Sequence, residues 1–253
     1  MTKHFVLPDV QIRPGDDTEF LSMIGEYIAE KRPEKIICLG DFADMASLSS
    51  YDVGKKAFEG RRYNKDIEAA VGAMKALLEP VRQLQERQTQ NKKKVYNPQM
   101  IMTLGNHENR INRATNTDAK LEGVLSTNHL QYKEFGWEVH DFLEVVVIDD
   151  IAYSHYFTSG VLGRPVTTAA AQLTKKHMSC IAGHQQGLQM SIGQRADGIQ
   201  LHGIIAGSCY EHNEDYLGPQ GNNHWRGALM LNDVNQGQFD VMPLSLKYLK
   251  GRK

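Results

Sequence analysis

Short apolar runs that are followed within two residues by a polar group recur along this chain and limit what it can fold into. Each run has the length of a buried β-strand, and an aspartate, asparagine or histidine follows where the strand would end. These runs lie at residues 5–7, 36–39, 100–104, 151–154 and 179–182. The carboxyl ends of parallel strands meet at one edge of a sheet, where functional groups gather. The pattern therefore predicts that polar groups from distant segments converge.

Amphipathic helical patterns separate the first three runs. Residues 18–31 carry apolar side chains at helical spacing, and Pro33 stops this helix. A longer helix runs from about residue 65 into the eighties, and Pro80 is expected to kink or restart it. This alternation of strand and helix predicts a mainly parallel sheet covered by helices.

The second half of the chain is richer in strands. Residues 145–154 predict a hairpin that ends at His155, and a helix is expected near residues 167–177. Further strands are expected near residues 188–192, 201–206, 228–231 and 239–242. The sequence contains no Pro/Ser-rich linker and no repeat. We therefore expect one α/β domain over residues 1–253, built from two facing mixed β-sheets flanked by helices.

Acidic and basic residues nearly cancel, which argues against a generic nucleic-acid or membrane binder. The formal net charge is −1 over 253 residues, whereas such binders are usually strongly basic. Basic clusters at residues 55–56, 61–62 and 92–94 have two interpretations. They form either a solvated surface or a basic rim for a polyanionic substrate, and Arg61-Arg62 is the better candidate for the rim.

The cysteines and the N-terminus predict a cytoplasmic protein. Cys38, Cys180 and Cys209 are widely spaced, so we expect buried free thiols rather than a disulfide framework. The N-terminus has no long apolar segment and no small-residue cleavage site, so it does not predict a signal peptide. No stretch approaches the roughly 20 apolar residues of a membrane span.

The polar groups behind the apolar runs are metal-ligand types. Carboxylates, imidazoles and amide oxygens bind hard-to-borderline divalent cations. Each motif is weak evidence alone, and the prediction rests on the set. The candidates are Asp9, Gln11, Asp41, Asp44, Asn106, His107, His155, His184 and Gln186.

In their order, these motifs resemble those of the calcineurin-like metallophosphoesterases. The spacing, and the segment Gly105-Asn106-His107-Glu108-Asn109-Arg110, resemble a phage-encoded branch of that superfamily, which would place the protein in a host cytoplasm. The resemblance extends over nearly the whole chain. It implies the two-sheet sandwich of that family and hydrolysis of phosphomonoesters or phosphodiesters by metal-activated water.

The resemblance also implies two metal positions that share Asp41. One ion would take Asn106, His155 and His184 in addition. The other would take Asp9, together with Gln11 and Gln186 at positions where the family usually has histidine. Amide oxygens suit Mg²⁺ and Mn²⁺ better than Zn²⁺ or Fe. We therefore expect a manganese-type site, with either two ions or a single ion whose partner is absent or weak.

Three further residues receive roles from the same resemblance. His107 would protonate or hydrogen-bond the leaving oxygen, and Asp44 would orient His107, unless Asp44 is only a turn or cap residue. Arg110 would hold a phosphate oxygen or else pair with an acid such as Glu108. The long polar and aromatic loop at residues 208–225 either lines the substrate pocket or is an ordinary loop.

Three functions follow from these interpretations. The first is a metal-dependent phosphoesterase, and the second is a nuclease of the same superfamily that acts on DNA or RNA. The third is a non-catalytic metal-binding module in which the two glutamines have removed the chemistry. The expected partner is a phosphoester substrate, with nucleotides and nucleic acids included. The sequence predicts neither the natural substrate nor the oligomeric state.

Overall fold

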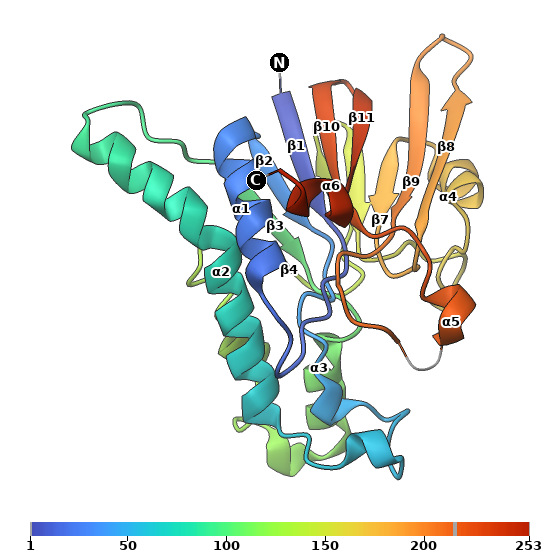
Figure 1. Cartoon of the computed structure of the whole chain (residues 1–253). Helices are drawn as coiled ribbons and strands as arrows, with labels where there is room; N and C mark the ends of the chain where they lie inside the picture. Colours follow the sequence, from blue (N-terminus) through green and yellow to red (C-terminus); the bar gives the residue numbers. More distant parts are fainter. Residues whose placement is uncertain (1, 215–216, 253) are drawn as a thin grey trace.

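The computed structural model describes residues 2–214 and 217–252. It is an α/β structure with two mixed β-sheets flanked by helices, as the sequence predicts (Figure 1). The first sheet has the strand order β11-β10-β1-β2-β3-β4. In it, β1 to β4 run parallel, and β10 and β11 add an antiparallel ribbon beside β1. Its strands are β1 (Thr2–Leu7), β2 (Lys35–Cys38), β3 (Gln99–Thr103), β4 (Glu138–His140), β10 (Gly227–Asn235) and β11 (Gln238–Ser245).

The second sheet has the order β5-β6-β7-β9-β8. Its centre is parallel, and the antiparallel strands β5 and β8 form its two edges. The predicted hairpin is β5 paired with β6. The strands are β5 (Val146–Ile148), β6 (Ile151–Ser154), β7 (Cys180–Ala182), β8 (Leu188–Gln194) and β9 (Gln200–Ala206).

The first sheet is covered on both faces, which explains why its parallel strands are apolar throughout. Successive side chains of a strand point to opposite faces. Phe5 and Leu7 join the core beneath the helices, whereas Val6 joins the core between the two sheets. Ile37 of β2 and Ile204 of β9 meet in this same inter-sheet core, so the two sheets pack face to face.

Two helices cover the outer face of the first sheet (Figure 1). They are α1 (Glu19–Lys31) and α2 (Tyr63–Gln90). The expected restart at Pro80 is wrong, because α2 continues through that residue. A Cβ on Gly25 of α1 would lie 2.2 Å from the carbonyl oxygen of Leu77 and 3.0 Å from Pro80 Cδ. The two helices therefore approach each other closely at the turn where the proline removes a helical hydrogen bond.

A shorter helix, α4 (Ala169–Lys176), covers the outer face of the second sheet. The side chain of Thr168 caps it by accepting a hydrogen bond from the main-chain N–H of Ala171. The sequence patterns did not predict β4 or the helices α3, α5 and α6. These helices are α3 (Asn109–Thr117), α5 (Gly218–Gly221) and α6 (Leu246–Lys250). Short 3₁₀ helices lie at Ala46–Leu48, Lys56–Phe58, Ala119–Leu121 and Thr127–Leu130.

A buried histidine joins the two sheets near the start of β1. His4 lies 2.7 Å through Nδ1 from the hydroxyl of Tyr153 on β6, and 2.9 Å through Nε2 from a carboxylate oxygen of Asp149. The Asp149 carboxylate only accepts, so Nε2–H donates to it and Nδ1 accepts from Tyr153. Burial lowers the pKa of His4 despite the carboxylate beside it.

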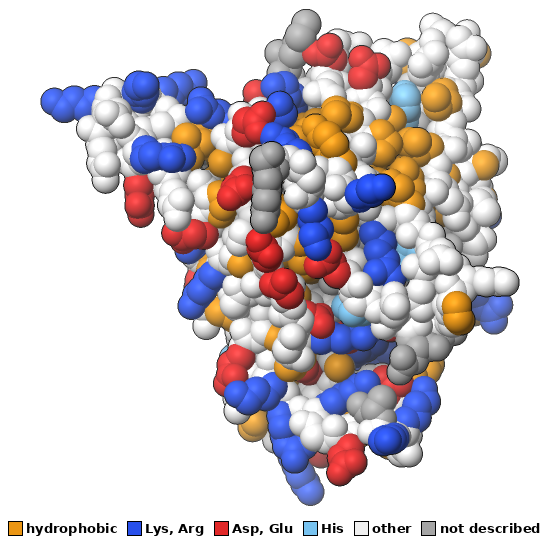
Figure 2. Space-filling model, in the orientation of Figure 1, with side chains coloured by type: hydrophobic (Ala, Val, Ile, Leu, Met, Phe, Trp, Pro, Cys, Tyr) orange, Lys and Arg blue, Asp and Glu red, His pale blue; other side chains and the backbone are white. Residues whose placement is uncertain are grey.

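Cys38, Cys180 and Cys209 are buried free thiols, as predicted. Among the described residues, no helix is long and apolar enough to cross a membrane. Figure 2 shows basic and acidic side chains interspersed over one face, in keeping with the net charge of −1.

Candidate metal centre

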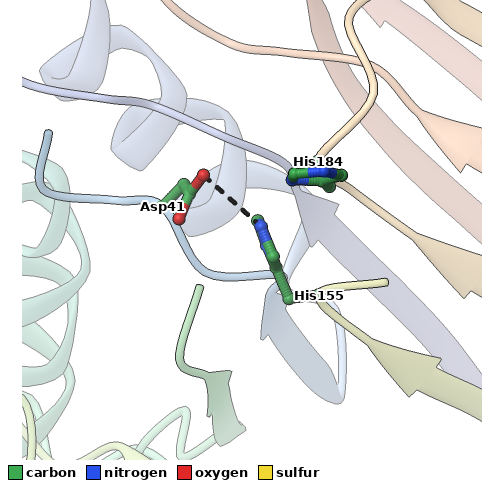
Figure 3. Close-up of side chains that lie close together, drawn as sticks. All are labelled: Asp41, His155 and His184. Carbon is green, nitrogen blue, oxygen red and sulfur yellow. Dashed lines mark ion pairs between the residues drawn. The ribbon is translucent and has the colours of Figure 1, made fainter. Parts of the chain in front are cut away.

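Asp41, His155 and His184 bring one potential ligand atom each to within 4.8 Å of one another (Figure 3). Asp41 follows β2 of the first sheet, whereas His155 and His184 follow β6 and β7 of the second. Parallel pairing of β6 with β7 places the two histidines at the same strand ends. Two sheets packed face to face thus bring these three side chains together at one edge.

The main chain fixes the orientation of His155. Its Nδ1 donates to the carbonyl oxygen of Leu39 at 2.7 Å, so Nε2 faces the cluster. Nε2 lies 2.9 Å from Asn106 Oδ1 and 3.4 Å from Asp41 Oδ2. In metal-binding histidines a second partner typically holds the other ring nitrogen, as the Leu39 carbonyl holds Nδ1 here. Because its Oδ1 lies 2.9 Å from His155 Nε2, Asn106 belongs to the same group of donors.

Asp9 also lies beside this group of donors. Its Oδ1 accepts from the main-chain N–H of His184 at 3.0 Å. Its Oδ2 is buried without a hydrogen-bond partner in the described structure. Burial raises the pKa of Asp9 to about 7, with Asp41 as a further cause. A buried carboxylate oxygen left without a donor fits a site built for a cation.

Burial and neighbouring charges shift the pKa values of the cluster residues in different directions. Burial opposes ionisation of Asp41, but His107 and His155 outweigh burial and lower the pKa of this carboxyl. Burial also opposes the charge on His155, yet Asp41 and Asp9 raise its pKa to about 9, and the dashed line in Figure 3 marks the resulting ion pair. Burial and His155 lower the pKa of His184 to about 4. His184 is therefore a neutral imidazole near pH 7, the form that binds metals.

Glycines let the main chain approach the two buried carboxylates. A Cβ on Gly105 would lie 2.0 Å from Asp41 Oδ1, and one on Gly183 would lie 2.5 Å from Asp9 Oδ1. Each glycine directly precedes a motif residue, Asn106 or His184. The Gly-Asn and Gly-His pairs in the sequence thus reflect space that a side chain would remove.

Gly105→Ala is expected to lower the free energy of unfolding by about 1–3 kcal/mol, the usual cost of overpacking a well-packed site. Denaturant titration measures this change. Gly72→Ala is the matched control, because Gly72 lies in α2 with nothing within 4 Å of its added Cβ. That variant should be about 0.5–1 kcal/mol more stable than the wild type. An equal response of both variants would show that Asp41 yields freely to the new methyl group.

Glu108 fixes two motifs through main-chain hydrogen bonds. Its buried carboxylate accepts from the main-chain N–H groups of Asp41 (2.9 Å), Ala43 (3.0 Å) and Gly105 (2.9 Å). Arg110 does pair with an acid, as one of its two expected roles has it, but the acid is Asp44 and not Glu108. The main-chain amides and the hydroxyl of Tyr132 occupy the Glu108 carboxylate. Sequence reasoning missed this role of Glu108, although its place beside His107 was a usable signal.

His107, Asp44 and Arg110 form a contiguous group beside the cluster. His107 Nδ1 lies 2.8 Å from Asp44 Oδ1, and its Nε2 lies 3.7 Å from Asp41 Oδ2. Arg110 Nη1 donates to the Asp44 carbonyl at 2.7 Å, and its Nη2 lies 3.1 Å from His107 Nε2. Thus Arg110 pairs with Asp44, and Asp44 contacts the histidine that it is expected to orient.

Gln11 and Gln186 lie on the loops that carry Asp9 and His184. Gln11 is buried, and its main-chain N–H donates to the carbonyl oxygen of Asp41 at 2.7 Å. Gln186 is half-buried, and its Oε1 accepts from the hydroxyl of Tyr210 at 2.8 Å. The expected pocket loop at 208–225 therefore reaches a candidate ligand, although residues 215 and 216 of this loop lie outside the described residues.

The structure gives Arg61 and Arg13 roles that the sequence did not predict. Arg61 Nη1 donates to the carbonyl of Ala46 at 3.0 Å and to Asp52 at 2.8 Å, so this side chain fastens its own loop. Arg13, which sequence reasoning did not select, donates to Asp44 at 2.5 Å. Its position two residues after Gln11 was the available signal.

The sequence matches no protein-family model, and no curated protein matches it significantly.

Proposed function

We propose that this protein is a divalent-metal-dependent phosphoesterase that hydrolyses phosphomonoesters or phosphodiesters. The observation that carries the proposal is the buried cluster of Asp41, His155 and His184, beside an Asp9 oxygen that lacks a hydrogen-bond donor. The ordered motifs resemble those of calcineurin-like metallophosphoesterases, and that resemblance supplies the reaction class.

The proposed donor set divides into two positions around Asp41. Asn106, His155 and His184 would hold one ion, and Asp9, Gln11 and Gln186 would hold the other. Oxygen donors dominate the second position, so Mn²⁺ is the proposed ion, with Mg²⁺, Zn²⁺ and Fe as alternatives. A bound divalent ion would lower the pKa of water and neutralise charge on the phosphoryl oxygens.

The remaining residues would act on the leaving group. His107 lies with Nδ1 2.8 Å from Asp44 Oδ1 and with Nε2 3.7 Å from Asp41 Oδ2. It would give a proton to the departing oxygen from Nε2 once Arg110 Nη2, which lies 3.1 Å from that nitrogen, turns to the substrate. Arg110 contacts both Asp44 and His107 and would hold this pair in position. A contact from Arg110 to a substrate phosphate is a second proposed role, because its guanidinium lies beside His107 Nε2.

A chelator is expected to reduce hydrolysis of bis(p-nitrophenyl) phosphate and p-nitrophenyl phosphate by at least about tenfold, since a metal supplies several kcal/mol of transition-state stabilisation. Adding Mn²⁺ should restore the rate. The measurement is p-nitrophenolate release with each metal in turn. A protein that binds Mn²⁺ but hydrolyses neither ester would instead be a non-catalytic metal-binding module.

The nuclease alternative is separated by substrate. Oligonucleotides and mononucleotides are compared at equal phosphate concentration, and a marked preference for oligonucleotides would support a nuclease. A nuclease needs phosphate contacts along a groove. Over the face in Figure 2, acidic side chains interrupt the basic ones, so that face offers no uniformly basic surface.

A further inference from the structure

Arg13 joins the Asp44–His107 pair to a segment far away in sequence. Its Nε donates to Asp44 Oδ2 at 2.5 Å, and its Nη2 donates to Glu214 Oε1. The two carboxylates are buried and Arg13 is half-buried, with exposed side-chain fractions of 8% for each carboxylate and 29% for Arg13. One planar guanidinium thus bridges two carboxylates, an arrangement for which arginine is better suited than lysine.

The Glu214 end of this bridge continues toward a proposed metal ligand. Glu214 Oε1 lies 3.0 Å from His212 Nε2, and the His212 ring stacks on Tyr210 with centroids 4.4 Å apart. The hydroxyl of Tyr210 donates to Gln186 at 2.8 Å. A continuous series of contacts therefore runs from Asp44 to Gln186 through residues 210–214.

The two oxygens of Asp44 have different partners. Oδ1 lies 2.8 Å from His107 Nδ1 and 3.3 Å from Arg110 Nη1, whereas Oδ2 accepts from Arg13. The terminal torsion of an aspartate has a broad range and does not hold its oxygens in place by itself. The bond to Arg13 limits rotation of the carboxylate and keeps Oδ1 directed at His107.

We propose that Arg13 is a positioning residue that orients His107 through Asp44, and that it couples this orientation to the segment at residues 210–214. The proposal rests on the proposed phosphoesterase function. In that reaction water attacks phosphorus and loses a proton to the solvent. The bond from phosphorus to the leaving oxygen breaks with its electron pair on that oxygen, which takes a proton from His107, and the solvent then restores the proton of His107. Arg13 contacts neither the ester nor this proton.

Arg13→Gln is expected to slow hydrolysis in proportion to how much the leaving oxygen needs a proton. Kcat for a phenyl phosphate ester should fall by about 10- to 100-fold, part of the roughly 10²- to 10⁴-fold that a general acid contributes. Kcat for the matching p-nitrophenyl ester should fall less than about threefold, since p-nitrophenolate departs readily without a proton. Equal losses on both esters would overturn the proposal.

A double-mutant cycle separates action through His107 from a general structural effect. In the His107→Ala background, Arg13→Gln should reduce kcat for the phenyl ester by less than about twofold, because residues that act as one unit are not additive. A full additional loss would mean that Arg13 acts independently of His107. Thermal unfolding of each variant verifies that the compared proteins are folded.

Arg226→Gln is the matched control for loosening of the same segment. Arg226 lies over the Tyr210 ring at 4.8 Å and donates to the carbonyl oxygens of Glu211 and Asn222. Within the described part of the chain, Arg226 forms no hydrogen bond or ion pair with Asp44, so the effect of its variant should not depend on the leaving group. Glu214→Gln reaches the bridge from its other end and should repeat the pattern of Arg13→Gln with smaller amplitude. This second variant serves if Arg13→Gln does not fold.

Failure of this proposal is distinct from failure of the phosphoesterase function. If the wild type hydrolyses neither ester with any divalent metal, the function itself is wrong. If the wild type is active and His107→Ala shows the leaving-group dependence while Arg13→Gln and Glu214→Gln do not, the function stands and the positioning role is wrong.

Discussion

Replacing Asp41 by asparagine is expected to remove metal binding and to lower kcat about a thousandfold, because a bound ion supplies several kcal/mol of transition-state stabilisation. Asp41 lies within the donor cluster, with Oδ2 3.4 Å from His155 Nε2. Asparagine keeps the size of the side chain and an acceptor for the main-chain N–H of His107, which now donates to Oδ1 at 2.7 Å. The substitution therefore removes charge with little change in shape.

The measurement for Asp41→Asn is the rise in melting temperature on adding Mn²⁺, together with kcat. An ion at a hundred times its Kd stabilises a protein by about 2.7 kcal/mol, and the variant should lose this response. Asp66→Asn is the matched control, because Asp66 is equally buried and accepts from the main chain of Ser47 outside the cluster. An Asp41→Asn protein that still gains the full Mn²⁺ stabilisation would place the ion elsewhere.

His107→Ala is expected to reduce kcat by roughly 10²- to 10⁴-fold while metal content stays the same. His107 Nδ1 lies against Asp44, and its Nε2 is 3.7 Å from Asp41, so the ring adjoins the donor cluster without belonging to it. The loss should be largest for esters with poor leaving groups. Metal analysis of the purified variant and kcat on two esters are the measurements.

His129→Ala serves as the control for loss of an imidazole. His129 lies at the surface beside Tyr63, with 2.8 Å between its Nδ1 and the tyrosine hydroxyl, and its variant should keep wild-type kcat. If His107→Ala lost its metal, the histidine would be a ligand rather than an acid. An unchanged rate on a poor leaving group would remove His107 from the reaction.

The sequence predicts most of the fold because local patterns carry it. Val6 and Ile37 lie between apolar neighbours, and such uninterrupted runs are typical of strands buried on both faces. Strand β4 escaped prediction because it has only three residues, Glu138–His140, with no apolar pattern. The proline rule could not choose between a kink and a restart at Pro80, and α2 continues through this residue where it packs closely on Gly25.

The sequence predicts those site residues that follow strands, but not those whose roles depend on distant partners. Asp9, Asp41 and Asn106 follow apolar runs, so strand pairing alone places them at one edge. The roles of Glu108 and Arg13 depend on partners that no local pattern reveals. Glu108 binds the main-chain amide of Asp41, 67 positions away, and Arg13 binds Glu214, 201 positions away. Such contacts follow from the packed fold and not from spacing in the sequence.

The two sheets are joined at opposite ends of β1 by different chemistry. At its start, His4 contacts Tyr153 of β6 and Asp149 in the turn between β5 and β6. Beyond its end, Asp9 faces His184, and the proposed ion would draw both sheets around itself. Loss of the ion would therefore loosen one end of the interface while the other stays held. The edge that carries the chemistry would then open with its own, lower free energy, separate from that of the remaining core.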